Sequence, residues 1–195
     1  SLHGGPSIMG TIFVDNLEPQ SGTSLTLGAS GDTVSLTAGA KTSGFGKIGQ
    51  VVSTTKTDTF STTSTSSTDI TGMSVSITPT STSSKIYINA SLSISSTANN
   101  YYFCNLLRDS TEICLGDADG SRDRVTTHGY NTYGPLNMGT SVSFLDSPNT
   151  TSSVTYKFQL RVSGGTGYLN KDHDDADSSN RGRDASTITV MEILD

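Results

Sequence analysis

The sequence predicts an all-β protein, in which a short fibrous, stalk-like N-terminal segment precedes an antiparallel, jelly-roll-like β-sandwich head. Apolar and hydroxylated residues alternate with a period of two along most of the chain, and the spacing of an amphipathic helix is nowhere sustained. Hydrophobic residues make up only 32% of the 195 residues, and the abundant Ser and Thr favour short strands and turns. We assign 1–9 to an arm or tag, 10–47 to a trimeric stalk and attachment segment, and 48–195 to the head.

The clearest predicted strands have one apolar and one hydroxylated face. Residues 85–95 (KIYINASLSIS) and 153–162 (SVTYKFQLRV) alternate most regularly, so their apolar side chains are expected to face a core. Residues 72–78 (GMSVSIT) repeat the scheme, and the TPTSTSS segment is expected to turn the chain back as a hairpin into 85–95. Further strands, spaced as in a two-sheet sandwich, are predicted at 48–54, 101–108, 112–116, 141–145 and 187–194.

Two cysteines, Cys104 and Cys114, flank the candidate turn RDST at 108–111. If Asp109–Glu112 frame this turn, Leu107 lies opposite Cys114, and Cys104 points to the other face of the hairpin. We therefore expect free thiols, while a register slip of one residue would place both cysteines on one face.

The stalk segment carries too few apolar residues to form a core of its own. Its stretch LTLGASGDTVSLTAGA, at 25–40, alternates around glycines, and a two-stranded unit of this size is marginal alone in water. We expect a neighbouring copy to cover its leucines, as in stacked fibrous repeats, which predicts a homotrimer. The alternative is a hairpin that lies on its own head. The candidate trimer-interface residues are Leu25, Leu27, Val34 and Leu36 and, in the head, Tyr102, Phe103 and Leu107.

The head residues of that set belong to the segment NYYFCNLL (100–107), which is apolar on both faces. A strand of this kind is either central in a sandwich or part of a subunit interface. The stalk argument favours the interface.

Five phrases give the chain a resemblance to a known family. They are GTIFVDNLEPQSGTSLTLGASGDTVSLTAGA, GFGKIGQVVSTTKTDTF, TDITGMSVSITPTSTSSKIYI, LLRDST and RGRDASTITVMEILD. With them the chain resembles the tail-fibre and related virion structural proteins of marine bacteriophages, especially cyanophages, over nearly everything after Met9. This resemblance implies a trimeric virion appendage, a thin stalk that ends in a β-sandwich knob and binds other virion proteins. It transfers no catalytic residue.

Charge is concentrated in two windows that are expected to be loops. Residues 108–124 and 171–184 hold 16 of the 30 charged residues. If both loops emerge at one end of the sandwich, they form a mixed-charge rim near several tyrosines, which suits the faces and hydroxyls of a host-surface glycan. The alternative is a capsid decoration protein without a receptor, whose loops only keep the particle soluble. The candidate ligand-binding residues are Asp117, Asp119, Arg122, Asp123, Arg124, Tyr130, Tyr133, Tyr168, Asp172, His173, Asp174, Asp175, Asp177, Arg181 and Arg183.

The acidic stretch NKDHDDADSSNRGRD (170–184) is also a weak calcium candidate through Asp172, Asp174 and Asp177, since carboxylates are hard oxygen ligands. It lacks the glycine that bends an EF-hand loop, and neighbouring Lys and Arg residues offer ordinary partners. The pattern GFGKIG (44–49) matches a dinucleotide-binding motif, but the residues after it read as a strand rather than the required helix. We expect neither metal nor cofactor.

Composition and motifs argue against several other functions. The net charge of −6, with no basic patch, disfavours nucleic acid as a partner, and no apolar run reaches the length of a membrane span. His128 lies near Gly129, Gly134 and Pro135 and is expected in a loop. The chain has no G-x-S-x-G elbow, and its three glutamates and loop aspartates give no evident catalytic pair. We therefore expect no enzyme, with a polysaccharide depolymerase as the minor alternative.

Overall fold

Eleven strands form the part of the chain that this computed structural model describes, residues 47–134 and 136–194. The strands are β1 (Ile48–Lys56), β2 (Phe60–Thr62), β3 (Thr68–Ile77), β4 (Lys85–Ser96), β5 (Asn100–Arg108), β6 (Thr111–Ile113), β7 (Thr127–Asn131), β8 (Met138–Asp146), β9 (Val154–Val162), β10 (Gly167–Leu169) and β11 (Ser186–Ile193). The described residues include no helix, so none that could span a membrane, and the predicted all-β class is confirmed. The predictions for Leu25, Leu27, Val34 and Leu36 concern residues outside these ranges.

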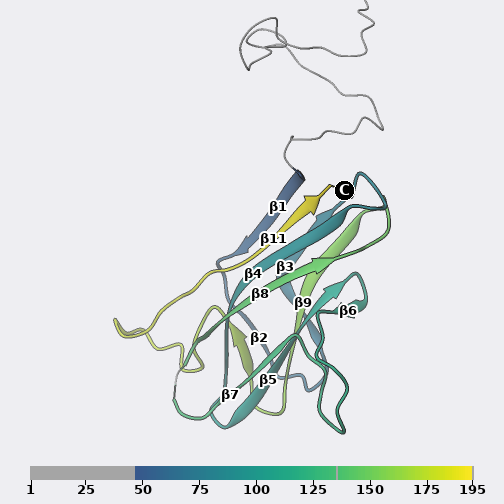
Figure 1. Cartoon of the computed structure of the whole chain (residues 1–195). Coiled ribbons are helices and arrows are strands. Elements are labelled where there is room, and N and C mark those ends of the chain that lie inside the picture. The colour runs from purple at the N-terminus through teal and green to yellow at the C-terminus, as the bar shows by residue number, and fades with distance from the viewer. Residues whose placement is uncertain (1–46, 135, 195) are drawn as a thin grey trace, which may run out of the picture. The chain divides into compact units, whose positions relative to one another are not determined.

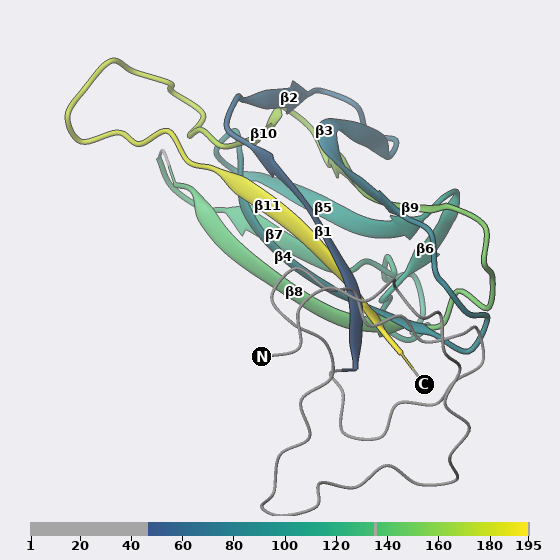
Figure 2. The ribbon, with the colours of Figure 1, turned by 90° about the horizontal axis from the view of Figure 1, so that it is seen from above.

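The strands build two antiparallel sheets that pack face to face (Figures 1 and 2). One sheet, here called the β4 sheet, has the order β1-β11-β4-β10-β2, and β8 pairs with the other edge of β4. The second, the β5 sheet, has the order β3-β9-β5-β6, and β7 also pairs with β5. The expected antiparallel sandwich is therefore confirmed.

The core lies between the two sheets and is built from the alternation seen in the sequence. Every second residue of β4 from Ile86 to Ile94 is buried, as is every second residue of β9 from Val154 to Val162. Burying one such aliphatic or aromatic side chain contributes roughly 1.5–3 kcal/mol. The prediction that these apolar faces point inward is confirmed.

The predicted hairpin between 72–78 and 85–95 is wrong. β3 belongs to the β5 sheet and β4 belongs to the β4 sheet, so the connection crosses from one layer to the other. Thr80, in this connection, is held by Glu192 of β11, whose Oε1 accepts hydrogen bonds from the Thr80 backbone N–H (2.6 Å) and hydroxyl (2.8 Å). The turn residues predict that the chain reverses, but not which strand it pairs with afterwards.

The assignment of Tyr102 and Leu107 to a trimer interface is also corrected. Both side chains are buried within the head, at 1% and 3% exposure, and so cannot contact a second chain. β5 lies between β9 and the short strands β6 and β7. The central-strand alternative for the doubly apolar segment is therefore the one the structure shows.

The cysteines are free, as expected, although the predicted register was wrong. Arg108 pairs with Thr111 across a two-residue turn in which Asp109 has a positive φ of 54°. Aspartate tolerates this backbone region better than most residues. Burial raises the pKa of the Cys104 thiol to about 12.

A buried polar cluster ties the two sheets together. Asp146 at the end of β8 accepts hydrogen bonds from Arg108 of β5 at 2.9 Å and from the hydroxyl of Tyr156 in β9 at 2.7 Å. Burial, together with this hydrogen bond to a carboxylate, raises the pKa of Tyr156. These contacts satisfy the buried carboxylate and fix the position of β8 over the second sheet.

Candidate functional site

A row of aromatic rings lies on the outer face of the β5 sheet. The residues Tyr101 and Phe103 are two apart on β5 and therefore share this face. The β7 register places Tyr130 opposite Tyr101 and His128 opposite Phe103. The ring centroids of Tyr101 and Tyr130 are 4.4 Å apart, and those of Phe103 and His128 are 6.3 Å apart and stacked.

An ion pair lies beside this aromatic row. Arg161 of β9 lies opposite Phe103 and places its guanidinium carbon 3.9 Å from the centre of the Phe103 ring. The same guanidinium binds the carboxylate of Asp123 at 2.8 Å. A cation over an aromatic face is attracted by the ring quadrupole, so Arg161 both covers one side of Phe103 and anchors the loop that carries Asp123.

The loop from β6 to β7 supplies further residues beside the aromatic row. Its end is fixed by Thr126, whose hydroxyl accepts the backbone N–H of Leu106 at 2.9 Å. Within the loop, the Arg122 backbone N–H donates to the Asp119 carbonyl at 3.2 Å around Gly120, which has a φ of +57°. Glycine adopts this conformation without strain.

Together these elements form a shallow cavity of about 300 Å³, here called the aromatic groove. Its lining residues are Tyr101, Phe103, Ser121, Arg122, Asp123, Val125 and His128. An aromatic floor with a few polar groups at one rim is typical of sites for ligands that have both an apolar face and hydroxyl groups.

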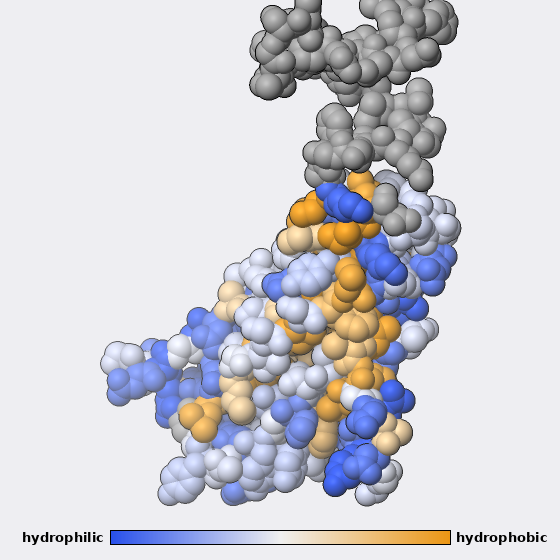
Figure 3. Space-filling view, in the orientation of Figure 1, coloured by the Kyte–Doolittle hydropathy of each residue, from blue (hydrophilic) through white to orange (hydrophobic). Residues whose placement is uncertain are grey.

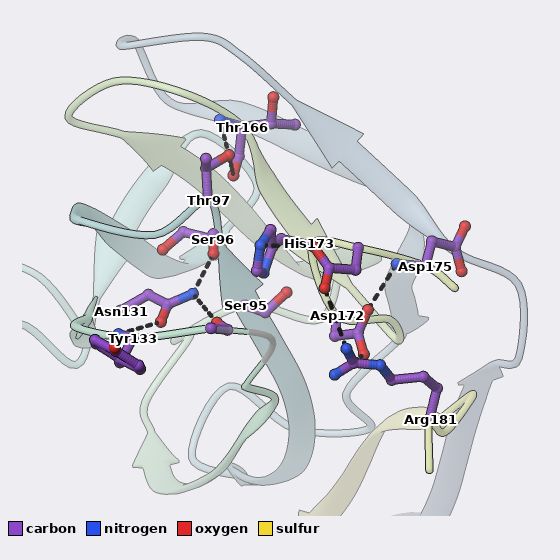
Figure 4. A network of polar contacts seen from close by, with 12 residues as sticks. Ser95, Ser96, Thr97, Asn131, Tyr133, Thr166, Asp172, His173, Asp175 and Arg181 are labelled. Atoms are coloured by element: carbon purple, nitrogen blue, oxygen red, sulfur yellow. Dashed lines mark hydrogen bonds and ion pairs between the residues drawn. The ribbon is translucent and has the colours of Figure 1, made fainter. Parts of the chain in front are cut away.

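The acidic loop between β10 and β11 forms a second polar cluster, in which several charged side chains form ion pairs with one another. Arg181 lies between two carboxylates, 3.5 Å from Asp172 and 3.1 Å from Asp174. Asp175 pairs with Lys171 at 3.1 Å, and its backbone N–H donates to the Asp172 carboxylate at 2.7 Å. Figure 4 shows Asp172, Asp175 and Arg181 gathered in this way. The loop therefore uses its charges to hold its own shape.

These carboxylates do not form a calcium cage. Within the described residues, no group of three or more His, Cys, Asp or Glu side chains is arranged to hold a metal ion. Of the three weak candidates, Asp172 and Asp174 bind Arg181, and Asp177 lies in an exposed part of the loop. His173 is engaged as well, with its Nε2 2.8 Å from Asp174.

The condition for a common rim of the two charged loops, that both emerge at one end of the sandwich, is not met. In both ribbon views the 114–126 loop and the 170–185 loop leave the sandwich on different sides (Figures 1 and 2). The groove is lined by residues of the first loop, and none of its lining residues comes from the second. The sandwich topology separates the two loops because they follow strands of different sheets.

The predicted site residues consequently fall into separate groups. Arg122 and Asp123 line the groove, and Tyr130 lies beside it, with its ring tilted by 40° against that of Tyr101. Tyr133 is 86% exposed in the turn after β7. The other candidate residues of the first loop lie outside the groove lining; they are Asp117, Asp119 and Arg124.

The second group surrounds the acidic loop. Tyr168 on β10 has the Lys171 ammonium 4.9 Å from its ring centre, a cation–π contact within the chain itself. Arg183 binds Asp175 at 2.6 Å. None of these residues reaches the groove.

Sequence reasoning missed three important groove residues. Tyr101 and Phe103 lie in the segment that is apolar on both faces, for which the sequence favours an interface, and Phe103 is among the residues predicted to form it. His128 is not in a loop but in β7, where Gly129 packs against Tyr102 and continues the strand. The signal that could have found them is the i, i+2 aromatic pair on a strand whose other face already fills the core.

Comparisons with known proteins add little to this geometry. No family model and no curated protein matches the chain. Among solved structures, the chain is similar to one in "Structure of infectious bursal disease virus Gt strain", with a TM-score of 0.43 and 12% identity. The match covers 84% of this chain and 42% of that one, so this chain spans less than half of that neighbour's length. A likeness of this size carries no argument about function.

Proposed function

We propose that the chain is a virion structural protein, a homotrimeric phage fibre or appendage whose head binds a host-surface glycan in the aromatic groove. The virion role is supported by the sequence phrases that resemble marine phage appendage proteins and by an all-β head of the kind this resemblance implies. Residues 10–47 would join three copies and attach them to other virion proteins.

The observation that carries the glycan assignment is the exposed aromatic row. Tyr101 is 45% exposed and Tyr130 is 38% exposed. A sugar ring presents apolar C–H groups on its faces and hydroxyls on its edge. The rings of the groove offer an apolar surface for the face, and the Asp123–Arg161 pair offers acceptors and donors for the hydroxyls.

A nucleic acid would use stacking rings as well, but it also needs cations that follow its phosphates. In the groove, Arg161 is already paired with Asp123, and Arg122 is paired with Asp119. The net charge of the chain is −6, which opposes a polyanion. The balance of charge therefore favours a ligand rich in neutral hydroxyls.

The test is binding of the full chain to an array of neutral and acidic oligosaccharides and to host surface polysaccharide. Tyr101→Ala removes the central ring of the row and is expected to weaken binding by about tenfold, which corresponds to ~1.4 kcal/mol. The matched control is Tyr133→Ala, which removes an exposed tyrosine outside the groove lining and should leave binding unchanged.

Absence of binding to every carbohydrate tested would overturn the receptor role and favour a capsid decoration protein. Equal losses for both tyrosine variants would show that the groove is not the site. Sedimentation equilibrium tests the trimer separately, with an expected mass of three times the 20.4 kDa chain.

A further inference from the structure

The outer face of the β4 sheet differs sharply from the outer face of the β5 sheet. Four strands lie side by side on it in the order β1, β11, β4 and β8. Of the charged residues on these strands, all within the described ranges, three are buried and only Lys85 is exposed, at the very start of β4. The buried three are Lys56, Asp146 and Glu192.

The side chains of this face form rows that cross all four strands. One row, near the end of the sheet where β1 begins, consists of Val51, Met191, Tyr87 and Leu145. Val51 and Leu145, at its two ends, are 55% and 52% exposed. This row is an uninterrupted apolar strip across the sheet.

Further along the strands the rows carry small polar groups. Thr55, Thr187, Ser91 and Ser141 lie in one register. Figure 3 shows the result, a surface that is mostly pale over the strands and orange toward the start of β1, with deep blue concentrated toward its margins. The outer face of the β5 sheet, in contrast, carries Lys157 paired with Asp69 and Arg161 paired with Asp123.

Depletion of charge is the compositional signal of an interface core. We propose that this face of β1, β11, β4 and β8, whose charged groups Lys85, Arg183 and Asp184 lie toward its two ends, is the surface through which the heads of several copies of the chain pack against one another. The proposal rests on the homotrimer of the proposed function and names the part of the head that forms it.

The distribution of charge limits which faces of two copies can meet. The described residues hold eleven Lys and Arg against fourteen Asp and Glu, so identical heads repel one another. Contact between two heads through their charged loops or their charged β5 sheets would bring like charges close together, which costs free energy. This face carries few charged groups, so two heads can approach through it with few like charges close together.

The dimensions also suit three copies. Strands in a sheet are ~4.8 Å apart, so four strands make a face about 19 Å wide. Three such faces around an axis enclose a triangle whose centre is roughly 5–6 Å from each sheet, close to half of the ~10 Å at which sheets pack. Side chains of ordinary size, such as those of the apolar row, therefore fill the space at the axis.

The experiment measures whether the face is covered in the full chain. Ser91→Cys places a thiol at its centre, and Ser74→Cys places a matched thiol on the exposed face of β3 in the other sheet. Labelling with a bulky maleimide is followed for each position by peptide mass spectrometry, which separates it from the native Cys104 and Cys114. We expect position 91 to react at least tenfold more slowly than position 74, in a protein whose sedimentation mass is several chains.

A charge variant provides the second measurement. In a Ser143→Cys background, Ser91→Lys should bring the reactivity at position 143 close to that at position 74, because buried lysines cannot be accommodated in the interface. The control Ser74→Lys should leave position 143 protected. Thermal unfolding shows that both variants remain folded.

The outcomes separate this proposal from the proposed function. Equal reactivity at positions 91 and 74 in a multimer overturns the proposal and leaves the trimer standing, joined elsewhere. Protection at position 91 in a particle of single-chain mass overturns it too, because residues of the same chain then cover the face. Equal reactivity in a single-chain particle overturns both this interface and the trimer.

Discussion

The carboxylate of Glu192 is buried, and both of its oxygens accept hydrogen bonds. Its Oε2 accepts the side-chain amide of Gln50 at 2.7 Å, and its Oε1 accepts the backbone N–H and hydroxyl of Thr80. Burial acts to raise the pKa of Glu192, but the hydrogen bonds from Gln50 and Thr80 outweigh it and hold the pKa below the usual value of 4.5. One side chain thus fastens β11 to β1 and to the connection between β3 and β4.

We predict that Glu192→Gln destabilises the head by ~2 kcal/mol at neutral pH. The side-chain NH₂ group of the glutamine would face at least one of the donors of Gln50 and Thr80, and that donor would lose its acceptor. A pKa that is lower in the folded state means that the ionised carboxylate contributes stability above the unfolded pKa of about 4.5. This contribution is lost as the pH falls through the lower, folded pKa.

Urea unfolding at several pH values checks both parts of this prediction. The difference in free energy of unfolding between the wild type and Glu192→Gln should be largest near pH 7 and shrink on acidification below about pH 4.5. A difference that stays constant down to strong acid would show that the charge of Glu192 is not what stabilises the contact.

At the scale of elements, the short strand β7 depends on a residue without a side chain. Gly129 lies opposite Tyr102, and a Cβ added to it would be 2.5 Å from the Tyr102 hydroxyl oxygen. Tyr102 is 1% exposed and cannot move away freely. Gly139, at the start of β8, is also a strand glycine, but a Cβ there meets nothing within 4 Å.

We therefore predict that Gly129→Ala destabilises the head by roughly 1–3 kcal/mol, the cost of overpacking a filled site. Gly139→Ala should be neutral or stabilising by a few tenths of a kcal/mol, because alanine restricts the unfolded chain. Denaturant midpoints of the two variants, compared with the wild type, give the answer. Equal effects at the two positions would mean that β7 is displaced from β5 in solution.

The strands show what the sequence could and could not predict about the fold. Period-two alternation identified the long strands and their buried faces, since each such strand hides one face regardless of its partner. It could not identify β2, β7 and β10, which are three to five residues long. It also could not distinguish a hairpin from the crossover after Ile77, because turn residues fix a reversal and not the sheet that the next strand joins.

At the scale of the whole molecule, the sequence predicted the ingredients of the candidate site better than their arrangement. Loops rich in charge were expected to bind a ligand together, yet one of them lines the aromatic groove and the other closes on itself. Which loops meet depends on the order of strands in two sheets. That order follows from pairings between residues far apart in the chain, which local patterns do not encode.

This separation leads to a prediction for the acidic loop. Arg181 holds Asp172 and Asp174 together, so Arg181→Ala should open the loop locally and speed its cleavage by a protease specific for aspartate several-fold. The global unfolding midpoint should fall by no more than ~3 °C, since the loop contributes little to the core between the sheets. Lys157→Ala, which breaks an ion pair on the outer face of the other sheet, is the control and should leave cleavage of the loop unchanged.

The decisive comparison is with carbohydrate binding by the same variant. Because the groove takes none of its lining from the acidic loop, a folded Arg181→Ala protein should bind glycans as the wild type does, while Tyr101→Ala does not. If Arg181→Ala loses binding with its midpoint intact, the ligand must extend from one loop to the other across the sandwich. The mixed-charge rim expected from the sequence would then be restored as a single site, formed by the ligand and not by contact between the loops.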